Sequence, residues 1–411
     1  MSEQEKNSGS VSDSQEDTRR VIENIGMLDL RSAKDIESLK NVTAIRNVGA
    51  IIIPEELAGM LAGIPMQNVG SVIPIPQGTN VSLQMGQVRL SGEALAAGPE
   101  DTILVLVGQV FVTSQVEKVG YKEMRLTGQL FAPRGSEGAL GAKMTQMTGQ
   151  VMYYPLTDPS QDLRVLIGDE SIGREFLELL EHPTVLVAVG DITFKEDITP
   201  DLLKTKVPAM MLVGDALVPR HLLPLVQALT AEKVGDITAY PKGARFFSGE
   251  DTLIGGYFES MAEPVALMIS GDVIIAEDVT PELLKSKVRE ITLTGQLYVP
   301  RPLLSLVQTL AVEKTGRIIA YPSGSRLCFF RGKDTLGREY FEFLPEPVAM
   351  IISGKVTLLE DVTPELIRDK VREIVLTGKL TAPKALTSLL RALMTEKTGK
   401  LQSLEEAQSE E

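Results

Sequence analysis

The sequence predicts an α/β repeat solenoid, in which parallel β-strands stack in coils of about 20 residues with short helices between them. Two nearly identical heptapeptides give the first indication, V-A-L-M-I-S-G at Val265–Gly271 and V-A-M-I-I-S-G at Val348–Gly354. The glycines that end this motif recur at a nearly constant interval of about 82 residues, at Gly108, Gly190, Gly271 and Gly354. Such regular spacing indicates stacked coils of nearly equal circumference.

Two further sets of glycines divide this long period into shorter coils. A motif of the form [LV]-[TV]-G ends at Gly128, Gly214, Gly295 and Gly378. Another glycine follows each of these at one constant interval, at Gly149, Gly235, Gly316 and Gly399. Between Gly271 and Gly354 lie Gly295, Gly316 and Gly337, so four coils form one long repeat. The earlier chain continues the rhythm less regularly, with Gly26, Gly49, Gly70 and Gly86.

Each coil has the pattern of a strand, a turn and a helix. Residues Ile291–Leu297 alternate between apolar and polar, which is typical of a half-buried strand. Pro300 ends this strand, because proline cannot donate a hydrogen bond to a ladder. Apolar residues then recur at helical spacing, at Leu303, Leu304, Val307, Leu310 and Val312. Lys314 and Gly316 predict the end of that helix, with the next strand over Arg317–Tyr321.

Three segments of the form Asp-x-Thr-Pro-acid predict helix starts. The threonines are expected at the N-cap and the prolines at the first helical position, where a missing N–H costs nothing. The three pairs are Thr199-Pro200, Thr280-Pro281 and Thr363-Pro364. The acid that follows each pair faces the positive end of the helix dipole.

The skeleton Val288-x-x-Ile291-x-Leu293, followed by a turn, a proline and a leucine-rich helix, resembles the leucine-rich-repeat family over about Asn41–Leu401. Where that family carries Asn or Cys in the turn, this chain has glycines such as Gly295. A parallel β-helix with helical decorations is therefore the alternative solenoid. The resemblance implies that the repeats bind proteins.

The expected organisation has three parts. Residues 1–40 form a disordered or irregular N-terminal segment. Residues 41–401 form a single continuous solenoid, with irregular coils over 41–149 and regular repeats of about 82 residues over 150–401. Residues 402–411 form an acidic disordered tail.

Composition excludes several functional classes. The formal net charge of −14 disfavours binding to nucleic acid or to an anionic membrane surface. The longest apolar runs are far shorter than the roughly 20 residues that span a bilayer, so no membrane insertion is expected. The N-terminus lacks the apolar segment of a secretory signal, and Cys328 is the single cysteine. These features predict a cytoplasmic protein.

No set of residues predicts catalysis, a cofactor or a bound metal. His182 and His221 are each replaced by other residues in the remaining repeats, and Cys328 lies in an apolar strand. In the glycine-rich stretch Gly135–Lys143, Ala142 separates glycine from lysine, so it does not form a phosphate loop. Acid pairs recur at Glu196-Asp197, Glu277-Asp278 and Glu360-Asp361, and helix capping explains their order without a metal.

The strands that lead into the periodic glycines are apolar on both faces, which is typical of a parallel sheet covered on both sides. The cover is either the chain's own helices or a partner, most simply a second copy. The candidate interaction surface comprises Met211, Val213, Met268, Thr292, Thr294, Ile351, Val375 and Thr377. We therefore expect a non-enzymatic scaffold for protein–protein interaction that self-associates as a homo-oligomer. The alternatives are a structural protein that polymerises end to end, and a small-molecule binder or enzyme with its site in the irregular 41–149 region.

Overall fold

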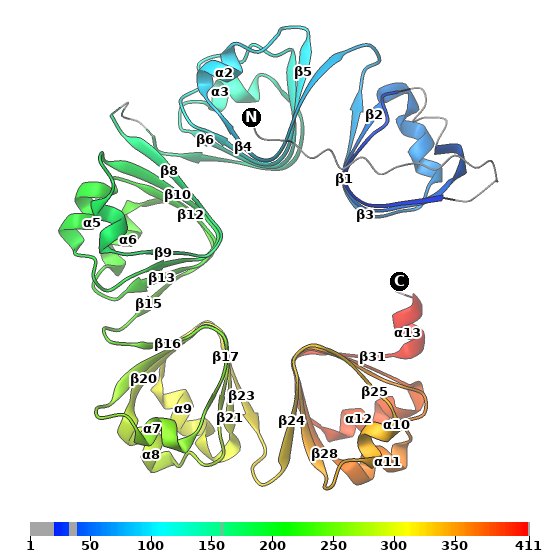
Figure 1. Ribbon diagram of the computed structural model, residues 1–411, viewed down its shortest axis with the longest axis vertical. Coiled ribbons are helices and arrows are strands. Elements are labelled where there is room, and N and C mark those ends of the chain that lie inside the picture. Colours follow the sequence, from blue (N-terminus) through cyan, green and yellow to red (C-terminus); the bar gives the residue numbers. More distant parts are fainter. Residues whose placement is uncertain (1–19, 33–38, 157, 159, 410–411) are drawn as a thin grey trace, which may run out of the picture. The chain divides into compact units, whose positions relative to one another are not determined.

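The periodic glycines form corners of the backbone. A computed structural model describes residues 20–32, 39–156, 158 and 160–409 of the chain. In each coil the chain runs in an extended conformation into the corner and out of it again, and a short helix or loop leads to the next coil (Figure 1). At Gly149 φ is 133°, and a Cβ would lie only 1.9 Å from the carbonyl oxygen of Gly128 in the coil below. Glycine is required there because L side chains rarely adopt this φ and because the space is filled.

One expectation from the sequence is corrected by these corners. Lys314 and Gly316 predict the end of a helix, but the helix ends at Leu310 and Lys314 lies in a strand. Gly316 is the corner that comes after this strand, and a Cβ there would lie 2.1 Å from the carbonyl oxygen of Gly295. The glycine spacing therefore measures the distance between stacked corners.

The coils group into five modules, which we number along the chain. Module 1 (20–75) contains β1 (Arg20–Asp29), η1 (Leu39–Asn41), β2 (Val42–Pro54), η2 (Glu55–Gly63) and β3 (Met66–Ile75). Module 2 (80–154) contains β4 (Asn80–Leu90), α2 (Gly92–Ala96), β5 (Thr102–Val112), β6 (Glu123–Pro133), α3 (Glu137–Gly141) and β7 (Met144–Tyr154). In these two modules each strand continues through its corner, so that each module has one bent parallel sheet, β1-β2-β3 or β4-β5-β6-β7.

In modules 3 to 5 the corner divides each strand in two. Module 3 (162–240) contains β8 (Asp162–Ile167), β9 (Glu170–Ile172), α4 (Arg174–Glu178), β10 (Thr184–Val189), β11 (Ile192–Phe194), α5 (Pro200–Lys206), β12 (Met210–Val213), β13 (Ala216–Pro219), α6 (Leu223–Leu229), β14 (Thr230–Val234) and β15 (Ile237–Tyr240). Module 4 (245–321) contains β16 (Arg245–Phe247), β17 (Glu250–Leu253), α7 (Gly255–Glu259), β18 (Val265–Ile269), β19 (Asp272–Ile275), α8 (Pro281–Lys287), β20 (Val288–Leu293), β21 (Gln296–Pro300), η3 (Arg301–Leu303), α9 (Leu304–Leu310), β22 (Ala311–Lys314) and β23 (Arg317–Tyr321). Module 5 (326–409) contains β24 (Arg326–Phe330), β25 (Lys333–Leu336), α10 (Arg338–Glu342), β26 (Val348–Ile352), β27 (Lys355–Leu358), α11 (Pro364–Lys370), β28 (Val371–Leu376), β29 (Lys379–Ala382), η4 (Lys384–Leu386), α12 (Thr387–Leu393), β30 (Met394–Lys397), β31 (Lys400–Ser403) and α13 (Leu404–Ser409).

Each of these three modules has two parallel four-stranded sheets that meet at the row of corners. In module 5, for example, the sheet orders are β24-β26-β28-β30 and β25-β27-β29-β31. Helices α10, α11 and α12 fill the space between the two sheets (Figure 1), and their Phe341, Ile367 and Leu390 enter the module core. The prediction of an α/β repeat solenoid is confirmed. The described strands place two sheets in most coils, a feature of the β-helix alternative.

The chain divides into two units. The first unit comprises Met1–Thr193, Asp197–Ala216 and Pro224–Asp236, and the second comprises Phe194–Glu196, Leu217–Leu223 and Ile237–Glu411. Modules 1 and 2 lie in the first unit and modules 4 and 5 in the second.

Within each unit, the part of a module that follows its corners packs against the first sheet of the next module. In the first unit, Phe111 and Phe131 of module 2 stack at 4.8 Å and pack against Val187 and Met211 of module 3. In the second unit, Tyr298 of module 4 packs against residues of module 5. Neighbouring sheets of the same chain therefore supply the cover of the apolar strands, which the sequence led us to expect from helices or from a partner.

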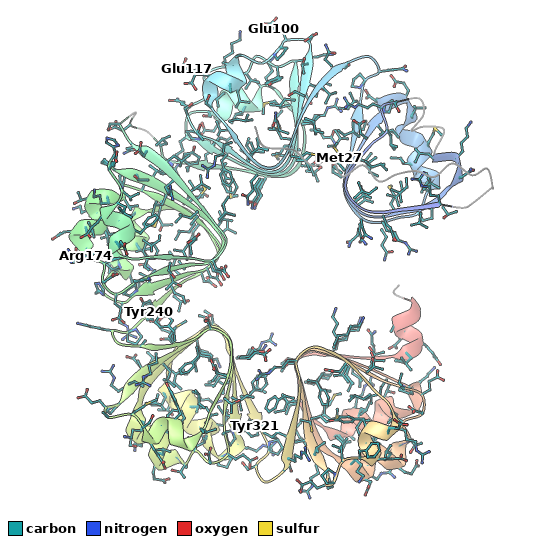
Figure 2. All side chains as sticks on the ribbon, viewed as in Figure 1. Met27, Glu100, Glu117, Arg174, Tyr240 and Tyr321 are labelled. Carbon is teal, nitrogen blue, oxygen red and sulfur yellow. The ribbon has the colours of Figure 1, made fainter. Side chains whose placement is uncertain are left out.

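A buried tyrosine ends the last coil of three modules. Figure 2 labels two of them, Tyr240 and Tyr321. The hydroxyl of Tyr240 donates to the carbonyl of Phe194 at 2.6 Å, and that of Tyr321 donates to the carbonyl of Ile275 at 2.5 Å. Tyr154 donates likewise to Val112. Each bond ties the fourth coil of its module to the second.

The predicted helix starts are confirmed. The hydroxyl of each N-cap threonine accepts a hydrogen bond from the backbone of the residue three positions later, and proline takes the first helical position. The bonds are Leu202 to Thr199 at 3.3 Å, Leu283 to Thr280 at 3.2 Å and Leu366 to Thr363 at 3.3 Å.

Both ends of the described chain are more regular than the sequence suggested. Strand β1 starts at Arg20 and pairs with β2, so stacking begins before residue 41. At the other end, β31 and α13 occupy residues expected to be a disordered tail. Ser403 and Glu406 form a reciprocal capping box there, with bonds of 2.9 and 3.2 Å, which explains why this polar segment is helical. Residues 1–19, 33–38 and 410–411 lie outside the described residues.

Candidate functional site: the outer face of the last module

The candidate interaction residues lie mostly in the interior. Five of the eight are fully buried, namely Met211, Met268, Thr292, Ile351 and Val375. Val213, Thr294 and Thr377 are half-buried, beside the corner glycines. Met211 and Val213 belong to the contact between modules 2 and 3, and Ile351 and Val375 to that between modules 4 and 5. The five buried side chains are therefore not a free surface, because the chain's own sheets and core already cover them.

The single-copy residues do not assemble into a larger group. The Nδ1 atom of His182 lies 3.2 Å from Asp162, and both side chains are 61% exposed. His221 is exposed, and Cys328 is half-buried against the core of module 5. Burial and the neighbouring Cys328 raise the pKa of the Tyr340 hydroxyl. Among the described residues no group of three or more His, Cys, Asp or Glu side chains is placed to hold a metal ion.

The recurring acid pairs bind backbone N–H groups of neighbouring coils. Asp278 accepts from Gly255 at 2.9 Å and Asp361 from Arg338 at 3.2 Å, which satisfies the starts of helices α7 and α10. Glu196 accepts from Gly243 at 2.7 Å, in the turn that leads to module 4. The acid pairs thus join coils and turns.

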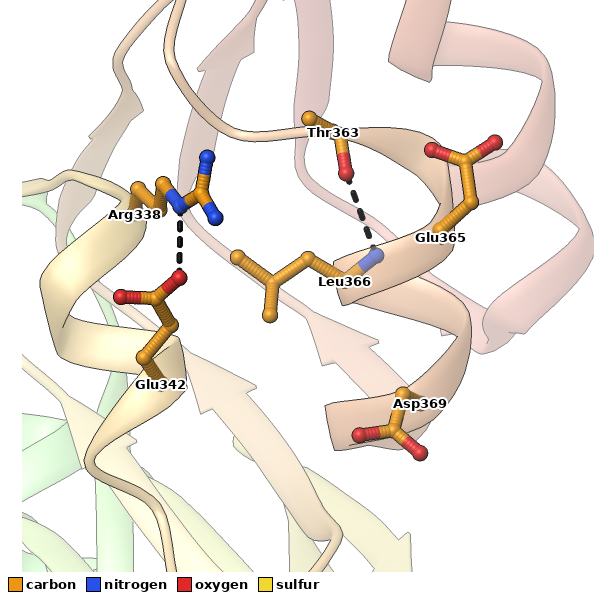
Figure 3. A pocket seen from close by; sticks show the side chains of 6 residues that line it. All are labelled: Arg338, Glu342, Thr363, Glu365, Leu366 and Asp369. Carbon is orange, nitrogen blue, oxygen red and sulfur yellow. Dashed lines mark hydrogen bonds and ion pairs between the residues drawn. The ribbon is translucent and has the colours of Figure 1, made fainter.

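The cavities that the described residues form include two that are open at the surface. One, of about 350 Å³, lies between α10 and α11 (Figure 3). Its lining is largely polar, and Arg338 and Glu342 satisfy each other at 2.6 Å. The other, of about 460 Å³, lies on the edge strand β7 in module 2. It is lined by Leu140, Gly141, Met144, Thr145, Met147, Val151 and Tyr153, a set without a charged side chain.

The residues directly after the corner glycines of a module form a row along its stacked corners. In modules 4 and 5 they begin the strands of the second sheet, whereas in module 3 they lie immediately before those strands. In module 2 this row is Gln87, Gln109, Gln129 and Gln150. In module 3 it is Asp169, Asp191, Asp215 and Asp236, which we call the aspartate row. In module 4 it is Glu250, Asp272, Gln296 and Arg317. In module 5 it is Lys333, Lys355, Lys379 and Lys400, which we call the lysine row.

The rows of modules 3 and 4 are held by identified partners. Asp191 accepts a hydrogen bond from the backbone of Asp215 at 2.9 Å, and Asp215 accepts one from Asp236 at 2.9 Å. Glu250 of module 4 pairs with Arg331 of module 5 at 2.5 Å. Burial raises the pKa of Asp272, and the nearby Arg331 opposes this change. The module 4 row is thus matched by charge from the module that comes after it.

The outer face of sheet β25-β27-β29-β31 is the position that a following module would cover. Its polar side chains, Thr357, Thr381 and Gln402, occupy the positions of Ile274, Tyr298 and Ile319 in module 4. Helix α13 lies on this face, on the opposite side of the sheet from α10, α11 and α12 (Figure 1). Lys333, Lys355 and Lys400 are exposed, and Lys379 is half-buried. This face is the candidate site, an ordered basic surface on a rigid sheet.

The buried side chain of Gln402 on this face has unsatisfied hydrogen-bonding groups. Its side chain is only 3% exposed, and neither its Oε1 nor its Nε2 atom has a hydrogen-bond partner. An unsatisfied buried amide is costly. In module 4 the apolar Ile319 stands at this position and packs against the next module.

The lysine row has a signal in the sequence that glycine periodicity alone does not expose. Each of the four corner glycines of module 5 is followed directly by lysine. The dipeptides become meaningful only when the corners are known to stack, because successive dipeptides then lie one strand apart in the same sheet.

Comparison with known proteins does not identify a relative. Family models, curated proteins and solved structures yield no match to this chain. No helix among the described residues is both long and apolar enough to cross a membrane.

Proposed function

We propose that this protein is a non-enzymatic scaffold that binds protein chains, including further copies of itself. The observation that carries the proposal is the outer face of the last module. In modules 2 and 4 the corresponding sheet face is covered by the first sheet of the next module. In module 5, as far as the described residues go, the short helix α13 lies on part of this face, which carries four lysines, two threonines and Gln402. Repeat proteins characteristically use such extended, rigid surfaces for binding.

The chemistry of the recurring contact between modules supports a protein partner. Arg220 pairs with Glu290 at 3.0 Å, and Arg301 of module 4 pairs with Glu373 of module 5 at 2.5 Å. At the equivalent position module 5 has Lys384, which pairs with Glu405 of α13 at 3.3 Å, with both side chains more than 70% exposed. A partner that supplies acidic groups would complete on module 5 the contact that Glu373 completes on module 4.

Light scattering after size-exclusion chromatography tests self-association. We expect the apparent mass to exceed 44.6 kDa and to rise with protein concentration at low salt. A strict monomer at all concentrations, together with no protein partner after purification from native cells, would overturn the proposal.

End-to-end polymerisation is a more restricted form of self-association. It would place the lysine-bearing face against the first sheet of module 1. There Glu23, Arg46 and Gln67 lie on neighbouring strands in register. One acid beside one arginine offers little attraction to four lysines, so charge does not favour this arrangement.

The apolar cavity on β7 favours a small-molecule site as the second candidate. Its lining residues include Met144, Met147 and Tyr153, which suit an apolar ligand but offer no acid–base pair. Binding of a fluorescent apolar probe, reduced at least about fivefold in Met147→Lys, would support this site. Equal probe binding by Met147→Lys would count against it.

A further inference from the structure

The geometry points to the aspartate row of a second copy as the partner of the lysine row. This inference deepens the proposed function and rests on it, because it names the partner and the residues on both sides. The lysine row lies in the second unit and the aspartate row in the first. Each copy therefore carries one donor row and one acceptor row.

The two rows match in charge and in number. The lysine row has four formal positive charges and the aspartate row four formal negative charges. All four aspartates are exposed. The chain as a whole has a net charge of −14, so four stacked lysines are a local departure from its overall charge. Like charges on neighbouring strands repel one another, and an opposing row of carboxylates would relieve that repulsion.

The two rows are also similar in spacing, because both follow the corner glycines of stacked coils. The lysines begin the strands β25, β27, β29 and β31, and the aspartates lie immediately before the strands β9, β11, β13 and β15. Neighbouring parallel strands lie about 4.8 Å apart, so the residues of each row repeat at that distance. Lys333, Lys355 and Lys379 are in direct register on adjacent strands. Two rigid rows with one repeat distance can form four ion pairs together, whereas flexible surface charges form them one at a time.

Two aspartates of the row accept hydrogen bonds from neighbouring coils and still have an oxygen that can bind a partner. The Oδ1 atoms of Asp191 and Asp215 accept backbone hydrogen bonds from the next coil, which fixes both side chains in place. A carboxylate has further acceptor positions on its second oxygen. These two aspartates are therefore already held in place before a partner arrives, which reduces the entropy lost on binding.

The resulting contact joins different surfaces of two copies. A heterologous contact of this kind leaves one unused row at each end, so that it forms rings or open chains and not a closed two-fold dimer. Exposed ion pairs are individually weak and are screened by salt. The association is consequently expected to be reversible and strongly dependent on ionic strength.

Neutral substitutions of the lysine row provide the first test, in the full-length chain. The variant K333Q/K355Q/K379Q/K400Q should weaken self-association at low salt at least about tenfold, measured by sedimentation equilibrium. The matched control K195Q/K204Q/K285Q/K314Q removes the same charge from other exposed positions and should leave association nearly unchanged. If the lysines instead act as a cap that keeps copies apart, the row variant will associate more strongly than the parent, and the inference is overturned.

Charge exchange provides the second test. The variants K333E/K355E/K379E/K400E and D169K/D191K/D215K/D236K should each fail to self-associate. Mixed together they should associate, because the lysines of the second variant can bind the glutamates of the first. Thermal unfolding and far-ultraviolet circular dichroism verify that both variants fold. Association of either folded variant alone at the level of the parent would contradict the row pairing.

These outcomes separate the inference from the proposed function. Self-association that survives both charge exchanges leaves the scaffold in place and removes only the row pairing. A parent chain that is monomeric at every salt concentration and retains no protein partner removes both.

Discussion

Modules 4 and 5 share one backbone arrangement but differ on the outer face of the second sheet. In module 4 this face carries Ile274, Tyr298 and Ile319, which pack against Ile351 and other residues of module 5. Module 5 has two threonines and a glutamine at the same positions, beside the lysine row. Core residues of the two modules are similarly aliphatic. The residue types on the inner face therefore follow from the packing within each module, whereas those on the outer face follow from the element that packs against it.

Among the substitutions that test this difference between modules 4 and 5, removal of the Tyr298 side chain should have the largest effect on stability. The ring is fully buried and meets Phe329 of the next module edge to face at 5.9 Å. Tyr298→Ala should lower the free energy of unfolding by about 3–5 kcal/mol, because it leaves a cavity between two sheets. The equivalent change in module 5, Thr381→Ala, should cost about 1 kcal/mol or less. Chemical denaturation measures both, and equal losses would show that the two faces are not distinguished by their cover.

The corner glycines should be equally essential in both modules. A Cβ at Gly295 would lie 2.1 Å from the carbonyl oxygen of Gly271, and one at Gly378 would lie 2.1 Å from that of Gly354. Gly295→Ala and Gly378→Ala should each cost about 2–3 kcal/mol, because backbone must move to admit the methyl group. Gly256→Ala in α7 is the control, since nothing lies within 4 Å of the added atom. Denaturation midpoints that fall as little in the corner variants as in the control would argue against stacked corners.

The sequence predicted the features that depend on neighbouring residues. The N-cap threonines are a local pattern and the glycine spacing is a regular repeat along the chain; the structure contains the capped helix starts and the stacked coils that they predict. The division of the coils of modules 3 to 5 between two sheets was missed, because residues on either side of Gly295 continue one apolar alternation. Only the contact between stacked corners reveals the bend.

The candidate surface could not be judged from the sequence because its cover comes from residues far along the chain. Thr292 illustrates this: its place in the strand pattern predicts an outward surface, yet it is fully buried and its hydroxyl has no hydrogen-bond partner. A strand pattern distinguishes the two faces of a sheet, but it does not reveal whether another module lies on the outer one. The lysine row was overlooked for the same reason, since its members are neighbours only in the stacked structure.

The hydrogen bond of the buried tyrosine should make a moderate contribution to the free energy of unfolding, and module 5 has no such bond at the equivalent position. Tyr321→Phe would leave the carbonyl of Ile275 without its partner and should cost about 1–2 kcal/mol. Leu404 takes this position in module 5, so the bond is confined to the earlier modules. Tyr257→Phe is the control, because the Tyr257 hydroxyl accepts a 3.3 Å bond from the exposed Arg245. Equal denaturation midpoints for the two variants would contradict a stabilising role of the Tyr321 hydroxyl.

The same tyrosine should also make stability depend on alkaline pH. Burial raises the pKa of the Tyr321 hydroxyl above the value near 10 that an unfolded tyrosine has. Its contribution is fully present below about pH 10 and is lost as the pH rises, because only the unfolded chain ionises readily. Denaturation at about pH 8 and about pH 10.5 should show a smaller loss in Tyr321→Phe than in the parent. An identical loss would place the alkaline sensitivity elsewhere.

The ion pair that bridges modules 4 and 5 should give the smallest effect and the most direct comparison. Arg301 lies 2.5 Å from Glu373, whose side chain is only 12% exposed, whereas Lys384 and Glu405 of module 5 are 76% and 72% exposed. Arg301→Gln should cost about 0.5–1 kcal/mol at low salt and less at high salt, while Lys384→Gln should cost almost nothing. A double-mutant cycle with Glu373→Gln isolates the pairwise energy from the loss of packing by the arginine stem. If the coupling energy of Arg301 with Glu373 is as small as that of Lys384 with Glu405, module 5 does not protect the first pair from solvent. The difference in charge between the two faces would then contribute to recognition and not to stability.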